Sequence, residues 1–286
     1  LQRFNILIPN ICPQVLQECE NSYEYYIDME YLNNHRELHT FEQKVIEKQM
    51  SILLQTLDDD VYCLKKRIDG HIWLDRFLDN KIYNKLDRYS ENNMMSLIIN
   101  SKELYINNQK YVGLRHCLND LIRNNVLKSN LAPNFISIVH GDLNLENILY
   151  NGHNDIKIID MDGSAVFDAI ELDLAKNFQS FVSKYELWSK DDELIISSET
   201  LINDNIIKTS HNAKTYFNFD KTKIDFLIKE WQKILECSED VVIKKGIFYM
   251  VTYFIRFVPF VKKISQQHAL FALIMSVVWL DKIFQM

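Results

Sequence analysis

The stretch Ile138-Val139-His140-Gly141-Asp142-Leu143-Asn144-Leu145-Glu146-Asn147-Ile148-Leu149, continued by Ile156-Lys157-Ile158-Ile159-Asp160, decides the fold of this chain. It is an apolar run, a tight polar loop, a second apolar run, a turn at Asn151-Gly152, and a third apolar run that ends in a carboxylate. Short apolar runs bounded by turn residues are typical of buried strands. The pattern therefore predicts a hairpin that brings the polar loop and Asp160 together.

Three polar side chains of this segment indicate phosphoryl transfer. Asp142 and Asn147 are five residues apart, and Asp160 follows eighteen residues after Asp142. The carboxylate of Asp142 can accept the proton of an acceptor hydroxyl, and Asn147 and Asp160 offer oxygen ligands of the kind that Mg²⁺ prefers. Positioning and charge neutralisation provide most of the catalysis in such a reaction. Asp and Asn also satisfy backbone groups in turns, but the flanking strands favour a site.

Three neighbours are expected to support this site. Gly141 lets the backbone adopt a conformation that a side chain would forbid. His140 is expected to be packed and hydrogen-bonded rather than catalytic. Asp162 would share the face of Asp160 along an extended chain, where it would support the metal or the substrate, or be a solvated turn carboxylate.

Composition describes an ordinary globular protein with a sizeable core. The 286 residues are 47% hydrophobic and 25% charged, with a net charge of -7, and length alone suggests about two domains. The negative charge excludes a general nucleic-acid-binding surface. It is compatible with a cationic substrate, although solubility is the commoner reason for it. Nothing in the sequence indicates an oligomeric state.

The cysteines and the apolar runs indicate the cytoplasm. Five scattered cysteines without a C-x-x-C pair argue against a disulfide framework or a cysteine zinc site. No signal peptide is visible. The longest apolar run, Ala269 to Leu280, is well short of the roughly 20 residues that span a bilayer, so no membrane insertion is expected. The chain starts at Leu1 rather than methionine, which suggests that it begins inside a longer gene product or after a disordered start.

The remaining pattern predicts an α+β fold with a strand-rich start, residues 1–32, and a mainly helical body, residues 33–286. Residues 24–32 are rich in strand-forming aromatics, and residues 103–114 alternate around Asn107-Asn108 as in a hairpin. Residues 191–219 are expected to be a polar loop with one short strand. Helices are predicted over residues 36–57, 71–89, 114–127, 173–185 (capped by Asp173), 221–235, 246–257 (ended by Pro259) and 267–283.

The segment from His140 to Asn147, followed by Ile159-Asp160, resembles the signature of the aminoglycoside phosphotransferase and choline kinase family, relatives of the protein kinases. The family's H-G-D-x-x-x-x-N loop carries the catalytic aspartate and a metal-binding asparagine, and its later I-D supplies the second magnesium ligand. The resemblance therefore implies a protein-kinase-like fold that uses ATP and Mg²⁺. It gives Asp142 the catalytic role and Asn147 and Asp160 the metal.

Two further segments share this resemblance, which covers residues from about 14 to 185. Asp173 in Leu172-Asp173-Leu174-Ala175 resembles the family's D-L-A, whose aspartate braces the catalytic loop. Residues 25–32 resemble the hinge strand, which implies that the backbone of Met29, Glu30 and Tyr31 faces adenine. The helices after residue 220 match the family's C-terminal lobe only in general character.

The chain departs from the kinase pattern in two respects. Asn144 stands where a Ser/Thr protein kinase usually has lysine, and no A-P-E segment follows Asp160; both favour a small-molecule acceptor. The phosphate-covering loop, the strand lysine and its paired glutamate should precede the hinge. Only about twenty residues come before Tyr23, and they contain no lysine, while six glycines in all leave no G-x-G-x-x-G or Walker A loop. These elements are therefore either encoded before Leu1, or this lobe is defective.

Other motifs give weaker indications. His35 and His39 have the i, i+4 spacing of zinc proteases, but Arg36 replaces the glutamate that this motif needs. The run at residues 65–67 fits a solvated charged surface better than a phosphate site. An aromatic box for a quaternary ammonium group is conceivable, but core positions are favoured for its candidate members, which are Tyr185, Trp188 and Trp279.

The sequence thus leads to two hypotheses. The first is an ATP- and Mg²⁺-dependent phosphotransferase acting on a hydroxyl of a small molecule such as choline, ethanolamine or a sugar. The second is a kinase-like nucleotide-binding or regulatory module that cannot transfer phosphate, and it is motivated by the missing lysine.

Overall fold

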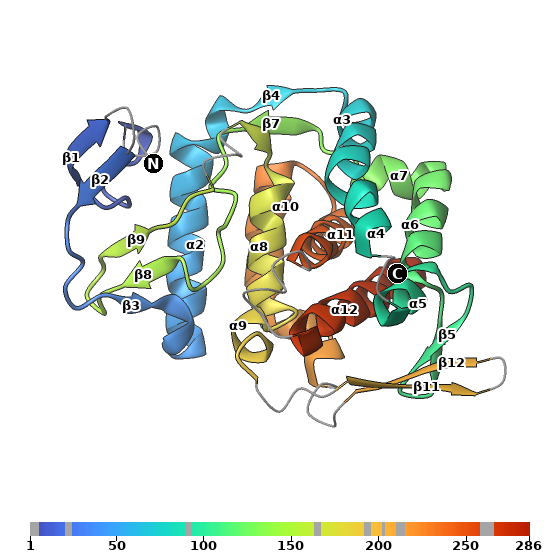
Figure 1. The fold of residues 1–286 in the computed structure, drawn as a ribbon. Helices are drawn as coiled ribbons and strands as arrows, with labels where there is room; N and C mark the ends of the chain where they lie inside the picture. The colour runs from blue at the N-terminus through green and yellow to red at the C-terminus, as the bar shows by residue number, and fades with distance from the viewer. Residues whose placement is uncertain are drawn as a thin grey trace.

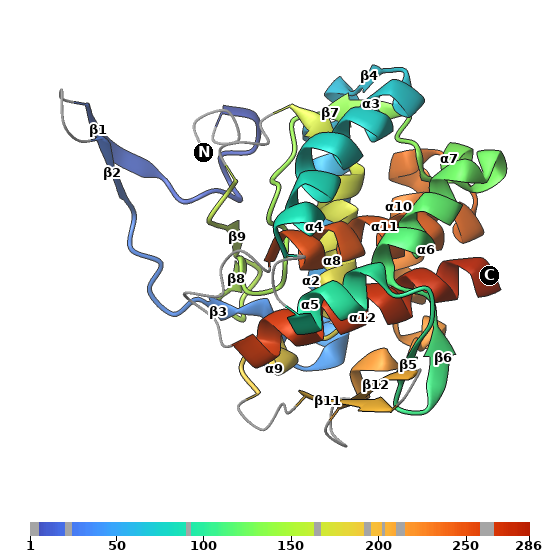
Figure 2. The same cartoon turned by 45° about the vertical axis from the view of Figure 1, so that its right-hand side comes forward.

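The computed structural model describes residues 6–20, 25–89, 93–162, 167–191, 196–201, 204–209, 215–257 and 266–286. The fold is α+β, as predicted: small sheets precede and edge a mainly helical body (Figures 1 and 2). One continuous hydrophobic core runs through the molecule, from Ile8 to Ile283.

The centre of the body is a group of long helices. They are α2 (Gln43–Asp60), α8 (Glu171–Phe181), α10 (Asp225–Leu235), α11 (Glu239–Phe257) and α12 (Gln266–Gln285). Helices α11 and α12 are apolar around most of their circumference and pack against each other, and α8 packs on α11. This all-round burial is what an all-round apolar sequence requires.

Shorter helices cover one side of this centre (Figure 1). Helix α3 (Gly70–Phe77) continues through a π-helical turn (Leu78–Tyr83) into α4 (Asn84–Tyr89), so the predicted helix over 71–89 is present with a widened middle. Beyond it lie α5 (Asn93–Asn100), α6 (Leu114–Arg123), α7 (Asn125–Leu131) and, below α8, the single-turn α9 (Tyr185–Trp188). The 3₁₀ turns include Leu38–Thr40, Tyr62–Leu64, residues 215–217 and Lys221–Lys223.

Two small sheets frame the polar loop that opened the sequence analysis. One sheet has the order β3-β8-β9, with β3 (Arg36–Glu37), β8 (Ile148–Tyr150) and β9 (Ile156–Ile158) all antiparallel. The other has the order β10-β7-β4, with β10 (Asp168–Ala169), β7 (Phe135–Ser137) and β4 (Lys66–Arg67). The predicted hairpin after the loop is confirmed as β8-β9. The strand before the loop belongs to the other sheet, so the loop bridges two sheets.

The two other sheets lie at opposite ends of the molecule (Figure 1). Strands β1 (Val15–Glu20) and β2 (Tyr25–Met29) form an antiparallel hairpin at the N-terminal end. The second sheet has the order β11-β12-β5-β6, where β11 (Ile196–Leu201), β12 (Asp204–Thr209), β5 (Leu104–Ile106) and β6 (Gln109–Tyr111) meet. The β12-β5 pair is parallel. The hairpin predicted around Asn107-Asn108 is confirmed, and both asparagines have positive φ.

Several predicted boundaries are wrong for physical reasons. The helix expected from Arg36 begins only at Gln43, because Arg36 and Glu37 pair with β8 and Leu38 enters the core through a 3₁₀ turn. The polar segment 191–219 contains two strands rather than one, because β12 pairs with the distant β5. The helix expected to start at 246 begins at Glu239, and Pro259 lies outside the described residues.

Helix α12 is, in the described part of the chain, the helix that is long and apolar enough to cross a membrane by length and composition. However, 78% of its most apolar window is buried inside the protein. Core helices meet the same criterion, and its packing against α11 accounts for its composition.

Gly246 of α11 packs directly against the Phe178 ring of α8. A Cβ atom at this position would lie 2.5 Å from Cε1 of Phe178, whose ring is rigid. In an ordinary helix, Gly→Ala stabilises by up to about 1 kcal/mol. Here we expect Gly246→Ala to lower the free energy of unfolding by about 1–3 kcal/mol, measured by urea denaturation, because it overpacks the contact. The same substitution should cost less in a Phe178→Leu background, and an unchanged or increased stability would contradict the packing argument.

Candidate functional site

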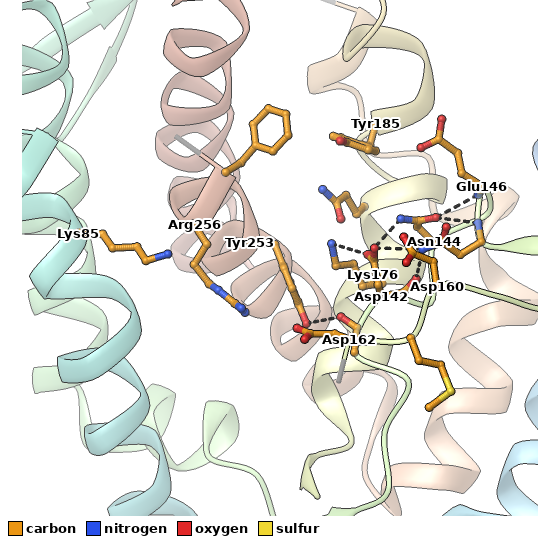
Figure 3. Close-up of a pocket in the computed structure, with 15 residues that line it drawn as sticks. Lys85, Asp142, Asn144, Glu146, Asp160, Asp162, Lys176, Tyr185, Tyr253 and Arg256 are labelled. Atoms are coloured by element: carbon orange, nitrogen blue, oxygen red, sulfur yellow. Dashed lines mark hydrogen bonds and ion pairs between the residues drawn. The ribbon is translucent and has the colours of Figure 1, made fainter. Parts of the chain in front are cut away.

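The polar loop of residues 138–147 lines a cavity of about 510 Å³ (Figure 3). One wall is acidic and comes from the loop and the segment after β9. The opposite wall is basic and aromatic and comes from α4 and α11. The lining side chains that matter below are Asp142, Asn147, Asp160, Asp162, Lys176, Tyr185, Tyr253, Lys85 and Arg256.

The Asp142 carboxylate is held from three directions. Its Oδ1 atom lies 2.9 Å from Lys176 Nζ and accepts a hydrogen bond of 3.1 Å from the Asn144 amide. Its Oδ2 atom accepts a hydrogen bond of 3.0 Å from Asn147 Nδ2. A carboxylate in these contacts is fixed as an oriented anion, and its side chain remains about a third exposed, at 31%, toward the cavity.

Asn147 and Asp160 offer oxygen atoms beside Asp142. The Asn147 amide nitrogen donates to Asp142 Oδ2 and to the Asp142 carbonyl, at 2.9 Å, which leaves its oxygen as the atom available to a cation. The backbone N–H of Ile159 bonds the Asn147 carbonyl, at 2.9 Å, and so ties Asp160 to the loop. The Asp160 carboxylate has no ion pair with another described residue, and its backbone has a φ of 56°.

These two residues suit a cation that keeps ligands from elsewhere. No group of three or more His, Cys, Asp or Glu side chains in the described ranges is placed to hold a metal unaided. Mg²⁺ commonly takes one or two protein oxygens and completes its shell with waters and substrate phosphates. Asn147 and Asp160 fit that pattern, and a closed structural metal site does not.

The conformation of the loop depends on Asp173, which is fully buried. Its carboxylate accepts hydrogen bonds from the backbone N–H of His140 (2.9 Å), the backbone N–H of Gly141 (2.7 Å) and the hydroxyl of Tyr62 (2.8 Å). Asp173 lies in the first turn of α8, which starts at Glu171, so the prediction that it caps the helix is wrong. Burial raises the pKa of Asp173 to about 6, although these hydrogen bonds lower it.

His140 and Gly141 serve the geometry of the loop. The His140 ring is buried, and its Nδ1 atom accepts a hydrogen bond of 3.2 Å from the Asp142 N–H. Burial lowers the pKa of His140 to about 4, so the ring stays neutral. Gly141 has a φ of 80°, which only glycine adopts easily. Its carbonyl accepts a hydrogen bond of 2.9 Å from the Tyr253 hydroxyl of α11.

Asp162 lies at the base of the cavity, on the side of Tyr253 (Figure 3). Its backbone N–H donates to the His140 carbonyl at 3.0 Å, so the segment after Asp160 folds back on the loop. Asp160 has left-handed backbone geometry, and therefore the two carboxylates are not related by the simple alternation of an extended strand. Both nevertheless line the same cavity.

The residues expected to face adenine lie elsewhere. Met29, Glu30 and Tyr31 are at the end of β2 and do not line this cavity. The Glu30 N–H donates to the carbonyl of Gln14 at 2.9 Å, and its carboxylate accepts a hydrogen bond from the Gln14 N–H. Tyr31 is 90% exposed. The structure thus groups Asp142, Asn147, Asp160, Asp162 and their supports, and leaves this segment apart.

Three alternatives weighed from the sequence lose support. His35 precedes β3 and bonds Asp155 at 3.1 Å, while His39 lies in a 3₁₀ turn, so they do not share one helical face. Trp188 and Trp279 are fully buried, and only Tyr185 of the proposed aromatic box reaches the cavity. Lys65 bonds the Ile234 carbonyl and Glu236, whereas Lys66 and Arg67 are exposed, as a solvated run would be.

Several residues of the cavity were missed in the sequence, among them Lys176, Tyr253, Arg256 and Lys85. Lys176 follows Asp173 by three positions, so the helical period places both on the side of α8 that faces the loop. The spacing of these two residues was therefore a signal in the sequence that could have identified Lys176. The same spacing relates Tyr253 and Arg256 on α11, but no pattern indicates that α11 faces the loop. Lys85 has no sequence signal, because it reaches the cavity only through the packing of α4.

Comparison of the sequence with protein-family models gives no match, and comparison with curated proteins gives none either.

The neutral, buried His140 predicts a pH dependence. Its pKa is about 4 in the folded protein and near 6.5 when unfolded, so its contribution to stability is complete above pH 6.5 and is lost as the pH falls toward 4. Asp173, whose pKa is raised, has the opposite slope. We expect the stability difference between wild type and His140→Asn to shrink by about 3 kcal/mol over this interval. Urea unfolding of both proteins at several pH values measures it, since the slope of Asp173 cancels; parallel pH profiles would contradict it.

Proposed function

We propose that the protein is an ATP- and Mg²⁺-dependent phosphotransferase that acts on a hydroxyl group of a small molecule. The observation that carries the proposal is the arrangement of Asp142, Asn147 and Asp160 around one cavity, with Asp142 held as an oriented anion by Lys176 and two amides. A buried aspartate, Asp173, holds the backbone that presents this arrangement. The loop's resemblance to the aminoglycoside phosphotransferase and choline kinase family supports the same reaction.

In this proposal Asp142 acts on the acceptor. Its carboxylate receives the hydrogen bond of the acceptor hydroxyl and aims that oxygen at the γ-phosphorus of ATP. A new bond forms between the acceptor oxygen and the γ-phosphorus, while the bond to the β,γ-bridging oxygen breaks and its electron pair leaves with ADP. The hydroxyl proton passes to Asp142 and then to solvent. Lys176 lies beside Asp142 and can neutralise negative charge on the moving phosphoryl group.

Asn147 and Asp160 would hold Mg²⁺ on the nucleotide phosphates. The metal supplies neutralisation of phosphate charge when it is bound. The two residues keep their oxygen atoms beside Asp142 through the bonds from Asn147 to Asp142 and from Ile159 to Asn147. The loop thus couples the position of the cation to the position of the acceptor.

The proposal includes a kinase-like organisation of the chain. Residues 1–32 would be part of an N-terminal lobe and residues 33–286 the C-terminal lobe, with Met29, Glu30 and Tyr31 near adenine. Because this segment does not line the cavity, the proposal has the nucleotide extend from the segment to the cavity. The second candidate is a nucleotide-binding module without transfer, and it is favoured by the position of Met29, Glu30 and Tyr31 away from the cavity. Turnover of ATP separates the two.

Replacing Asp142, the proposed general base, tests the proposal directly. We expect Asp142→Asn to lower phosphoryl transfer by about 10²–10⁴-fold, because the amide retains the shape but cannot accept the proton. Formation of ADP and of a phosphorylated acceptor, followed by ³¹P NMR over a panel of alcohols and sugars, measures it. Asp59→Asn, an exposed carboxylate on α2, is the matched control and should behave as wild type. Equal turnover in Asp142→Asn and wild type would refute the assignment.

The metal assignment has its own test. We expect Asn147→Ala to raise the Mg²⁺ concentration needed for half-maximal transfer by about tenfold or more, because one protein oxygen is lost from the cation. A titration of turnover with Mg²⁺ measures this shift. Thermal unfolding without metal separates it from misfolding, since Asn147 also bonds the loop. An unaltered Mg²⁺ dependence would remove Asn147 from the metal site.

A further inference from the structure

We propose that the acceptor carries an oxyanion, a carboxylate or a phosphate group, and that Lys85 and Arg256 bind it across the cavity from Asp142. This inference depends on the proposed function, because only a phosphotransferase has an acceptor. It narrows the class of substrate that the protein would phosphorylate. The two cations come from α4 and α11 and enter the cavity from the wall opposite the catalytic loop (Figure 3).

Lys85 and Arg256 lack a carboxylate counterion among the described residues. Neither Lys85 nor Arg256 forms an ion pair with a carboxylate in the described ranges. Other cations of the same helical region do: Arg115 pairs with Asp87 at 2.7 Å and Lys128 with Asp75 at 2.7 Å. Two half-buried cations therefore enter the cavity from one wall, Asp142 and Asp160 lie at the other, and Asp162 lies between them on the side of Tyr253 (Figure 3).

Keeping Lys85 and Arg256 charged at this wall without an anion costs electrostatic free energy. Lys85 is partly removed from water, which lowers its pKa, and the positive charge of Arg256 lowers it further. Like charges at a partly desolvated site repel each other, and an anion between them offsets both the repulsion and the desolvation. Arginine adds a planar fork of donors that matches a carboxylate or phosphate.

Contacts through Tyr253 fix the position of Arg256 relative to Asp142. The Arg256 guanidinium lies over the Tyr253 ring, with Cζ 4.8 Å from the ring centroid, and Lys176 Nζ lies 4.0 Å from the same centroid. The Tyr253 hydroxyl bonds the Gly141 carbonyl, next to Asp142. An oxyanion at Arg256 would therefore be held in a defined position relative to Asp142, as a positioned hydroxyl requires.

The position of Lys85 in the fold indicates that the acceptor, and not the nucleotide base, meets these two cations. The N-terminal hairpin and the β3-β8-β9 sheet lie on one side of α2 and α8, whereas α4 lies on the other side (Figure 1). The segment expected near adenine belongs to the first side. Lys85 is thus on the far side of Asp142 from the nucleotide base, where the acceptor must lie.

The same geometry disfavours amino alcohols. A choline or ethanolamine head group would meet two positive charges, and the aromatic box that could hold it is not formed, because Trp188 and Trp279 are buried. The acceptors that fit are hydroxy acids and phosphorylated alcohols or sugars. Their anionic group would bind the basic wall while a hydroxyl reaches Asp142.

A binding experiment without nucleotide tests the anion site. We expect the purified protein to bind D-glycerate or glycerol 3-phosphate at least about tenfold more tightly than neutral glycerol or cationic ethanolamine, measured by isothermal titration calorimetry. Arg256→Gln and Lys85→Gln should each lose about tenfold in affinity for the anionic probes, and Arg256→Lys should lose less than Arg256→Gln. Arg88→Gln, an exposed cation on the same helix as Lys85, should match wild type.

Several results would overturn the inference. They are equal binding of neutral and anionic probes, no binding of either anionic probe, unchanged affinity in both Gln variants, or loss of Mg·ATP affinity instead of anion affinity in those variants. Circular dichroism and thermal unfolding confirm that each variant is folded.

The transfer assay keeps this failure separate from failure of the proposed function. Phosphorylation of neutral or cationic alcohols that is unaffected by Lys85→Gln and Arg256→Gln overturns the anionic acceptor and leaves the phosphotransferase intact. Tight binding of the anionic probes through these two residues, with no transfer in wild type, supports the anion site and refutes the phosphotransferase.

Discussion

The hydrogen bonds of one buried carboxylate determine where the site lies. Asp173 accepts hydrogen bonds from two consecutive backbone N–H groups of the polar loop and from the hydroxyl of Tyr62, and so joins α8, the segment after α2 and this loop at one point. A buried charge is tolerated only when it is satisfied in this way. The backbone of His140 and Gly141 is consequently fixed, and Asp142 projects from a rigid position.

The cavity separates charge across its width. Asp142 and Asp160 lie at one side, with Lys176 beside them, Asp162 lies toward Tyr253, and Lys85 and Arg256 lie at the other side (Figure 3). The electric field across such a cavity favours a ligand with a positive end and a negative end. A phosphate chain with a bound cation would lie at the acidic wall, and an anionic group would lie at the basic wall. Tyr253 connects the walls, because one ring contacts Lys176, Arg256 and the Gly141 carbonyl.

Local patterns predicted what local interactions control. The β8-β9 hairpin, the Asn107-Asn108 turn and the helical body could be predicted from apolar periodicity and turn residues, and the members of the acidic wall from their spacing. The start of α2 and the strands β11 and β12 could not, since pairing with β8 and β5 overrides local propensity. Lys85 and Arg256 are 171 positions apart, and no periodicity indicates that their helices meet.

The left-handed backbone of Asp160 has a consequence for the history of the chain. A non-glycine residue at a φ of 56° costs on the order of 1 kcal/mol, and glycine at the same position would not. The local backbone energy therefore favours glycine at residue 160, whereas the proposed role in holding Mg²⁺ requires the carboxylate. Under the proposed function, in which this carboxylate holds Mg²⁺, the strain at this position is an exchange of stability for chemistry, and descendants that lost the chemistry would be free to lose the aspartate.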